Sequence, residues 1–125
     1  MLIRKSSEDY LETILMLKER TGAVHSVDIA AELNFSKASV SVAMKKLREN
    51  GYILMEHDGQ IELTEEGMKI ASSIYSRHRI LTQFFIQLGV DPAVAAEDAC
   101  KVEHDLSEET FQCLVNHAKA RGGMK

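Results

Sequence analysis

The chain has 125 residues, of which 45% are hydrophobic and 27% are charged, and this balance fits one soluble globular domain or one domain with an appended helical module. No apolar run approaches the roughly 18 residues that cross a bilayer, and the N-terminus turns polar too early for a secretory signal. We therefore expect a cytoplasmic protein, and the two cysteines fit a compartment that keeps thiols reduced.

The charges are distributed unevenly along the chain. The net charge of −4 argues against nonspecific binding to nucleic acid. The segment from Lys37 to Arg48, however, carries four basic residues and no acidic one, whereas the segment from Gly89 to Cys113 carries seven acidic residues and one basic one. The first segment could face phosphate and the second could hold cations, although charge runs are usually only solvated faces.

The first half of the chain reads as three helices. A helix is expected over residues 6–20, where apolar residues recur at helical spacing. Ser26 is expected to cap a second, short helix over 27–34, and Ser36 to cap a third over 37–49, whose inward stripe is apolar and whose outer face is basic. A tight turn joins the second and third helices.

A hairpin and a long helix follow. Two runs able to form strands flank Asp58-Gly59, a dipeptide suited to a type I′ turn. Thr64 is expected to cap a helix over 65–88 that carries many large apolar residues. Hairpins in this position, directly after a pair of helices joined by a tight turn, are called wings.

Two further helices complete the expected fold. Asp91 precedes a proline and should cap a helix that runs to about Asp105, and Ser107 should begin the last helix. The order of elements predicts a mainly α chain: a winged helix-turn-helix DNA-binding domain over residues 1–64, followed by an all-helical domain over 65–125, with the long helix linking the two.

The third helix is the expected recognition helix, because an α-helix fits the major groove and its first turns approach the base edges. The alternative is a solvated, lysine-rich helix in a winged domain that does not bind DNA. The candidate DNA-binding residues on this helix and at its cap are Ser36, Lys37, Ser39, Ser41, Lys45 and Lys46.

The stretch "ACKVEHDLSEE" contains Cys100, Glu103 and His104 at spacings of three and four residues. On a helix these spacings place a thiol, a carboxylate and an imidazole on a common face. Such donors suit first-row divalent metals. In the alternative interpretation, the cysteine packs, the glutamate is solvated and the histidine makes one hydrogen bond.

Two other helices offer side chains of the same kind. Asp9 and Glu12 share a face of the first helix, and His78 lies beside the apolar stripe of the long helix. A helical histidine in such a place is more often a satisfied core residue than a ligand. Three helices that each offer ligand-type residues nevertheless favour a metal site.

The segments "SSEDYLETIL", "VDIAAELNFSKASVSVAMKKLRENGYI", "LTEEGMKIASSIYSRHRIL" and "ACKVEHDLSEE" together resemble the diphtheria toxin repressor family of metal-dependent transcriptional repressors, most closely its short manganese-regulator branch. The resemblance implies a homodimer that binds a palindromic operator, dimerises through the helices after the wing, holds metal between its two domains and controls metal-uptake genes. Matching ligand positions of the manganese branch are Asp9, Glu12, His78, Glu103 and His104.

The chain also departs from that branch. Cys100 resembles the iron branch, whereas Asp9 stands where the iron branch has a methionine, and Thr82 and Ala96 fall where a second metal site of that branch would need ligands. We therefore expect iron(II) or manganese(II), with zinc or cobalt possible in vitro, and neither a membrane nor a small organic ligand as partner.

Two other functions remain open at this point. The first is a winged-helix regulator whose metal cluster is structural or vestigial. The second is a metallohydrolase that uses Glu103 or Glu12 as its base, although no catalytic motif accompanies these residues. The regulator that responds to metal is the favoured interpretation, and we expect no enzymatic activity.

Overall fold

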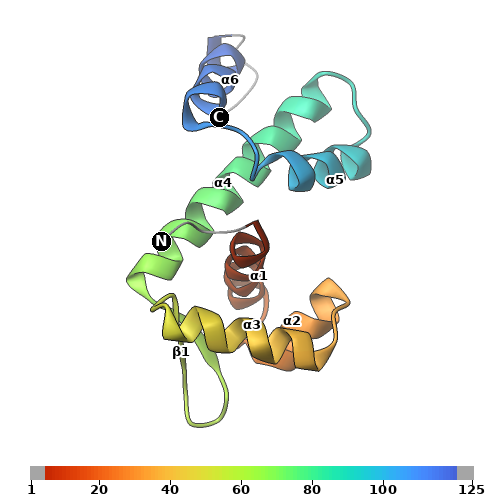
Figure 1. The fold of residues 1–125 in the computed structure, drawn as a ribbon. Helices are drawn as coiled ribbons and strands as arrows, with labels where there is room; N and C mark the ends of the chain where they lie inside the picture. The colour runs from red at the N-terminus through yellow and green to blue at the C-terminus, as the bar shows by residue number, and fades with distance from the viewer. Residues whose placement is uncertain (1–4, 121–125) are drawn as a thin grey trace. The chain divides into compact units, whose positions relative to one another are not determined.

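The computed structural model describes residues 5–120, which divide into two compact units between Ser73 and Ile74 (Figure 1). The boundary between the units falls inside α4 (Glu65–Gln87), the helix expected to link two domains. Among the described residues, no helix combines the length and the apolar character that a membrane span requires.

The first unit contains three helices and a two-stranded hairpin. Its helix α2 packs against α1 and α3, and the hairpin packs against the same two helices (Figure 1). The core is made of fully buried apolar side chains from every one of these elements, among them Leu11, Ile29, Val40 and Ile53. The helices are α1 (Lys5–Thr21), α2 (Ser26–Leu33) and α3 (Lys37–Glu49), and the strands are β1 (Ile53–Met55) and β2 (Ile61–Leu63).

The helix-turn-helix has one expected cap and one unexpected cap. As predicted, Ser36 caps α3, because its hydroxyl accepts a hydrogen bond from the backbone N–H of Ser39 at 3.1 Å. The prediction that Ser26 caps α2 is wrong, since Ser26 is already helical. His25 is the cap, and its backbone N–H donates to the carboxylate of Asp28 at 2.9 Å. The turn that leaves α2 uses Asn34 at a φ of 57°, a left-handed conformation that asparagine tolerates.

The wing is an antiparallel hairpin in which Leu54 pairs with Glu62. The predicted type I′ turn is wrong, because that turn requires positive φ at both central residues, and among the described non-glycine residues only Asn34 has positive φ. Instead, the N–H of Gly59 donates to the carbonyl of Glu56 at 2.9 Å. Within this loop, Gly59 is the residue with a positive φ, 84°. This pattern is a type I turn followed by a left-handed glycine, which makes the loop one residue longer.

The second unit is entirely helical in its described part, residues 74–120. It comprises the remainder of α4, α5 (Pro92–Val102) and α6 (Glu108–Ala120) (Figure 1). Its core is formed by Leu81 of α4, Ala99 of α5, and Phe111 and Val115 of α6.

The caps of the second unit match the predictions, but one helix end does not. Asp91 caps α5 by accepting from the N–H of Ala93 at 3.1 Å, and Ser107 caps α6 by accepting from the N–H of Thr110 at 3.1 Å. Helix α5 ends at Val102, however, and not near Asp105. A winged helix-turn-helix followed by an all-helical unit is thus confirmed as the fold class.

Candidate metal centre and nucleic-acid interface

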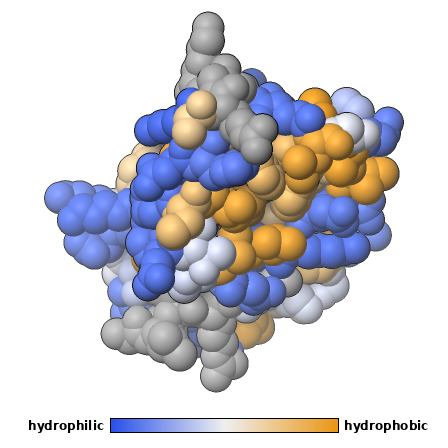
Figure 2. All heavy atoms as spheres, turned by 90° about the horizontal axis from the view of Figure 1, so that it is seen from above, coloured by the Kyte–Doolittle hydropathy of each residue, from blue (hydrophilic) through white to orange (hydrophobic). Residues whose placement is uncertain are grey.

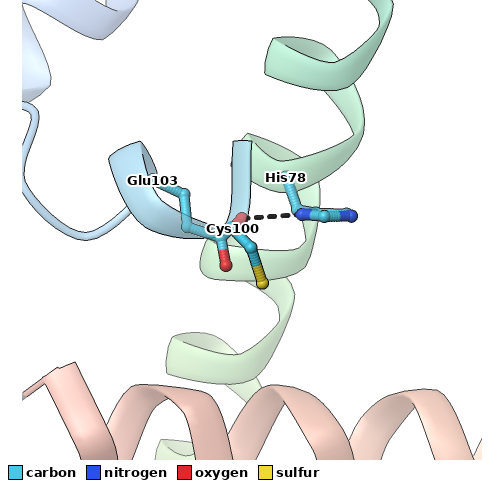
Figure 3. A group of neighbouring side chains, drawn as sticks. All are labelled: His78, Cys100 and Glu103. Atoms are coloured by element: carbon cyan, nitrogen blue, oxygen red, sulfur yellow. Dashed lines mark hydrogen bonds and ion pairs between the residues drawn. The ribbon is translucent and has the colours of Figure 1, made fainter. Parts of the chain in front are cut away.

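Helices α4 and α5 bring three potential metal ligands together within the second unit. His78 points from α4 toward Glu103, the residue that ends α5, and its Nδ1 lies 2.9 Å from Oε2 of Glu103 (Figure 3). Cys100, one helical turn earlier on α5, places its thiol beside them (Figure 3). One ligand atom of each of these three residues lies within 4.8 Å of the other two.

These donors fit a divalent transition metal. Two atoms bound to one ion at about 2.1 Å in tetrahedral or octahedral geometry lie about 3 Å apart, close to the separation of His78 and Glu103. The Glu103 side chain is fully buried, and its Oε1 makes no hydrogen bond among the described residues. Because a buried carboxylate oxygen without a hydrogen bond is costly, a bound cation would remove a penalty that the second unit otherwise carries.

His104 lies beside the same carboxylate, although it does not lie on α5. Its Nε2 is 3.4 Å from Oε1 of Glu103, and its side chain is almost fully buried. The predicted common face holds for Cys100 and Glu103, because Glu103 keeps a helical φ of −58° and its N–H donates to the Ala99 carbonyl at 2.9 Å. His104 lies beyond the end of α5. The turn beyond the helix, where the N–H of Asp105 donates to the carbonyl of Val102 at 3.0 Å, brings His104 next to Glu103.

Asp9 and Glu12 lie in the first unit, on α1. Glu12 is buried and Asp9 is half-buried, and the spacing of three residues places both carboxylates on one face of the helix. Cys113 and His117 form a similar pair on α6, but both are exposed and neither belongs to the cluster of His78, Cys100 and Glu103.

Arg77 contacts the segment that follows α5, next to this cluster, and the sequence analysis did not identify it. Its guanidinium donates to the carbonyl oxygens of Glu103 at 3.1 Å and Leu106 at 2.7 Å, and to the carboxylate of Glu108 at 3.0 Å. The hydrogen bond from Arg77 is the largest of the effects that hold the pKa of the Glu108 carboxyl below its ordinary value. The only sequence signal was the position of Arg77 directly before His78.

The predicted DNA-binding residues are all exposed on α3 or at its cap. Ser36 and Ser39 are engaged with each other, because the Ser36 hydroxyl donates to the Ser39 hydroxyl at 2.9 Å. The basic face of the helix is exposed to solvent at Lys37, Lys45 and Lys46.

Val42 is a candidate that sequence reasoning did not include. It lies on α3 among these polar residues and is 57% exposed, whereas Val40, Met44 and Leu47 of the same helix are buried. An exposed apolar side chain on a helix that enters the major groove can contact thymine methyl groups. The sequence could have indicated this residue, because Val42 lies outside the apolar stripe that Val40, Met44 and Leu47 form on this helix.

A winged helix with an exposed basic helix, followed by a helical unit with a metal-ligand cluster, defines a metal-responsive DNA-binding regulator. The sequence pattern described as the iron dependent repressor N-terminal DNA binding domain matches residues 1–61, and that of the iron dependent repressor metal binding and dimerisation domain matches residues 64–120. The chain therefore belongs to the iron-dependent repressor family of metal-dependent transcriptional regulators, and the resemblance to its manganese-regulator branch is confirmed.

Individual relatives agree with this assignment. The transcriptional regulator MntR of Salmonella typhimurium is 35% identical over 119 residues, which cover 95% of this chain and 76% of the relative. An uncharacterised HTH-type transcriptional regulator of Methanocaldococcus jannaschii is 38% identical over 112 residues, which cover 88% and 90%. The solved structure of the manganese regulator SloR superimposes with a TM-score of 0.79 at 30% identity and covers all of this chain, which spans 56% of that structure.

Proposed function

We propose that this protein is a homodimeric repressor that binds a palindromic operator when it holds a divalent transition metal, and that it controls genes of metal uptake. The observation that carries the proposal is the combination of an exposed basic helix in one unit with the cluster of His78, Cys100 and Glu103 in the other. The first offers a surface for DNA, and the second offers donors for the ion.

The proposed metal ligands come from both units. His78, Cys100 and Glu103 would hold the ion, and His104 would approach from the turn after α5. Asp9 and Glu12 of α1 would join them, so that one ion would have ligands in both units. The ion would supply the positive charge that neutralises these clustered carboxylates, and iron(II) and manganese(II) are the ions we propose.

DNA contacts would come from α3. Its exposed lysines would approach phosphates, and its first turns, with Lys37 and Ser39, would lie against the base edges. Val42 would contact a thymine methyl group from the same exposed surface.

Dimerisation is assigned to the second unit. Leu88, directly after α4, is 67% exposed, and Val94, in the first turn of α5, is 47% exposed. Figure 2 separately shows that apolar side chains gather on part of the face it draws. A second copy of the chain would cover such a surface. The two-fold axis of the dimer would then match the two halves of a palindromic operator.

Operator binding tests the proposal. A duplex selected from a random library with the metal-loaded protein is labelled, and its affinity is measured anaerobically with manganese(II), iron(II), zinc(II) or cobalt(II), and with a chelator. Metal should tighten binding by at least about tenfold, which corresponds to about 1.4 kcal/mol of coupling. Equal affinity with and without chelator would reject the metal-sensing role and leave DNA binding intact.

The variant Lys37→Ala tests DNA binding separately from metal binding. Because Lys37 lies on the first turn of α3, far in sequence from the cluster, the variant should bind the operator more weakly and depend less on salt, with unchanged metal affinity. An unchanged operator affinity and salt dependence would mean that α3 is not the recognition helix.

A further inference from the structure

Arg77 connects α4 to the segment between α5 and α6 within the second unit. Besides its bonds to the carbonyl oxygens of Glu103 and Leu106 and to the Glu108 carboxylate, its guanidinium stacks over the Phe111 ring, with its central carbon 4.9 Å from the ring centroid. Only 12% of the side chain is exposed. A side chain with four partners, nearly removed from water, has little freedom to adopt another conformation.

The carbonyl contacts satisfy main-chain acceptors just beyond the end of α5. The last carbonyl groups of a helix have no partner within it and must be satisfied by other donors. The Glu103 carbonyl would find such a partner further along if the helix continued, but Arg77 supplies the donor instead. Nη1 of the guanidinium donates to both carbonyls and Nη2 donates to the Glu108 carboxylate. A lysine ammonium is a single nitrogen that ends one bond nearer the main chain, so it cannot occupy both positions.

This clamp acts on the same residues that make the metal cluster. Arg77 immediately precedes His78 on α4, and one of the carbonyls it binds belongs to Glu103 itself. The clamp therefore sets the distance between the helix that carries the imidazole and the peptide that carries the carboxylate. Ligands must be held within about 0.5 Å of their productive positions, and partners that orient ligands affect metal affinity by about 10- to 100-fold.

We propose that Arg77 is a positioning residue of the metal centre: it holds the Glu103–Leu106 main chain so that Glu103 and His104 stay in place against His78. This inference rests on the proposed function, since it requires that the cluster binds metal. Arg77 itself carries a positive charge and does not ligate the ion. Its effect is transmitted through the two main-chain carbonyls.

Arg77→Lys tests this role in the full-length chain. The variant keeps the charge, but its single nitrogen ends one bond short of Nη1 and cannot hold both carbonyls and the Glu108 carboxylate in place. It should bind manganese(II) and cobalt(II) at least about tenfold more weakly than the wild type. Arg79→Lys is the matched control, because Arg79 lies on the same helix, is exposed and only stacks on Tyr75 with its guanidinium carbon 5.7 Å from the ring centroid. The control should retain wild-type affinity.

Affinity is measured by competition with a fluorescent metal indicator. The temperature is kept below the onset of thermal unfolding, which circular dichroism records for each apo protein. A purely structural role would lower the melting temperature of apo Arg77→Lys without changing the affinity of the folded protein. If Arg77→Lys does not fold, Arg77→Gln is used instead, because its planar amide keeps an N–H donor. The metal-induced rise in its melting temperature then reports affinity relative to its own apo form.

The outcomes are distinguishable. If the wild type binds neither ion, the proposed function fails, and the role of Arg77 fails with it. If the wild type binds and the folded Arg77 variant binds equally well, the positioning role alone is overturned. An equal loss in Arg79→Lys would also overturn it, because the effect would then belong to any altered cation on α4.

Discussion

Cys100 places a thiol beside the imidazole of His78 and the carboxylate of Glu103, and it is the soft donor of the cluster. In the resemblance drawn from the sequence, Cys100 matches the iron branch, so this position sets the chain apart from the manganese-regulator branch that it otherwise resembles. Thiolates favour iron(II), cobalt, nickel and zinc over manganese. The ion preferred by this protein therefore depends on whether the thiol binds.

Replacing Cys100 with glutamate should shift metal preference toward manganese. If the thiol binds an ion, it does so as a thiolate and releases its proton, and a thiolate bound to cobalt gives a sulfur-to-metal charge-transfer band in the near ultraviolet. We expect this band in the wild-type cobalt form and not in Cys100→Glu, which should keep its fold and its metal-dependent operator binding.

The second cysteine provides the control. Cys113 is exposed on α6 and lies outside the cluster, so Cys113→Ser should keep the band. A wild-type cobalt form without the band would show that Cys100 does not bind the ion. The proposed ligands would then be carboxylates and imidazoles alone, and manganese would be the favoured ion.

At the scale of secondary-structure elements, the junction between the wing and α4 depends on Gly67. A Cβ added there would overlap the carbonyl oxygen of Tyr52, which already accepts a hydrogen bond from the N–H of Thr64 at 3.1 Å. The Thr64 hydroxyl in turn accepts from the N–H of Gly67 at 3.1 Å and donates to the Gly51 carbonyl at 2.7 Å. The first turn of α4 is thereby fixed against the residues that precede β1.

Gly67→Ala should destabilise the protein by about 1–3 kcal/mol, the usual cost of overpacking. Helix propensity alone predicts the opposite sign, because alanine is favoured over glycine by up to about 1 kcal/mol inside a helix. Urea unfolding followed by circular dichroism measures the difference. Ser72→Ala, at an exposed position of α4, is the control and should be neutral or slightly stabilising. A stabilised Gly67→Ala variant would contradict the close approach to Tyr52.

The starts of α3, α5 and α6, which are set by local caps, could be predicted from the sequence. The Ser36, Asp91 and Ser107 caps bond to N–H groups two or three residues further along, so a short window contains the whole interaction. The contact of Arg77 with the Glu103 carbonyl could not be predicted in this way, because the two residues lie 26 apart and only the fold brings them together.

The candidate metal site shows the same limit. Helical spacing placed Cys100 and Glu103 together correctly, and it did not reveal that His104 follows the end of the helix. The approach of His78 to Glu103 joins residues 25 apart. Residue type and the family resemblance both suggested His78 as a ligand, but helical spacing could not place it beside Glu103. Residue type indicated the chemistry, but the packing of α4 against α5 determines the geometry.

At the scale of the whole molecule, ligand-type side chains occur in both units, which share the continuous helix α4. Metal can change the affinity for DNA only if it interacts differently with the DNA-competent state and with the other conformations of the protein. Carboxylates on α1, in the unit that contains α3, would provide that difference. Donors confined to the second unit could affect DNA binding only through the dimer.

The double variant Asp9→Asn, Glu12→Gln should therefore separate metal binding from its effect on the operator. His78, Cys100 and Glu103 remain, so metal binding should persist with reduced affinity, whereas the gain in operator affinity on adding metal should fall from at least about tenfold to nearly none. The measurement is operator anisotropy at metal concentrations that saturate each protein, with saturation checked by indicator competition. Glu19→Gln, an exposed position on the same helix, should respond to metal as the wild type does. If the double variant also keeps the full response, the α1 carboxylates do not couple the ion to DNA, and the coupling must arise within the second unit, through the dimer.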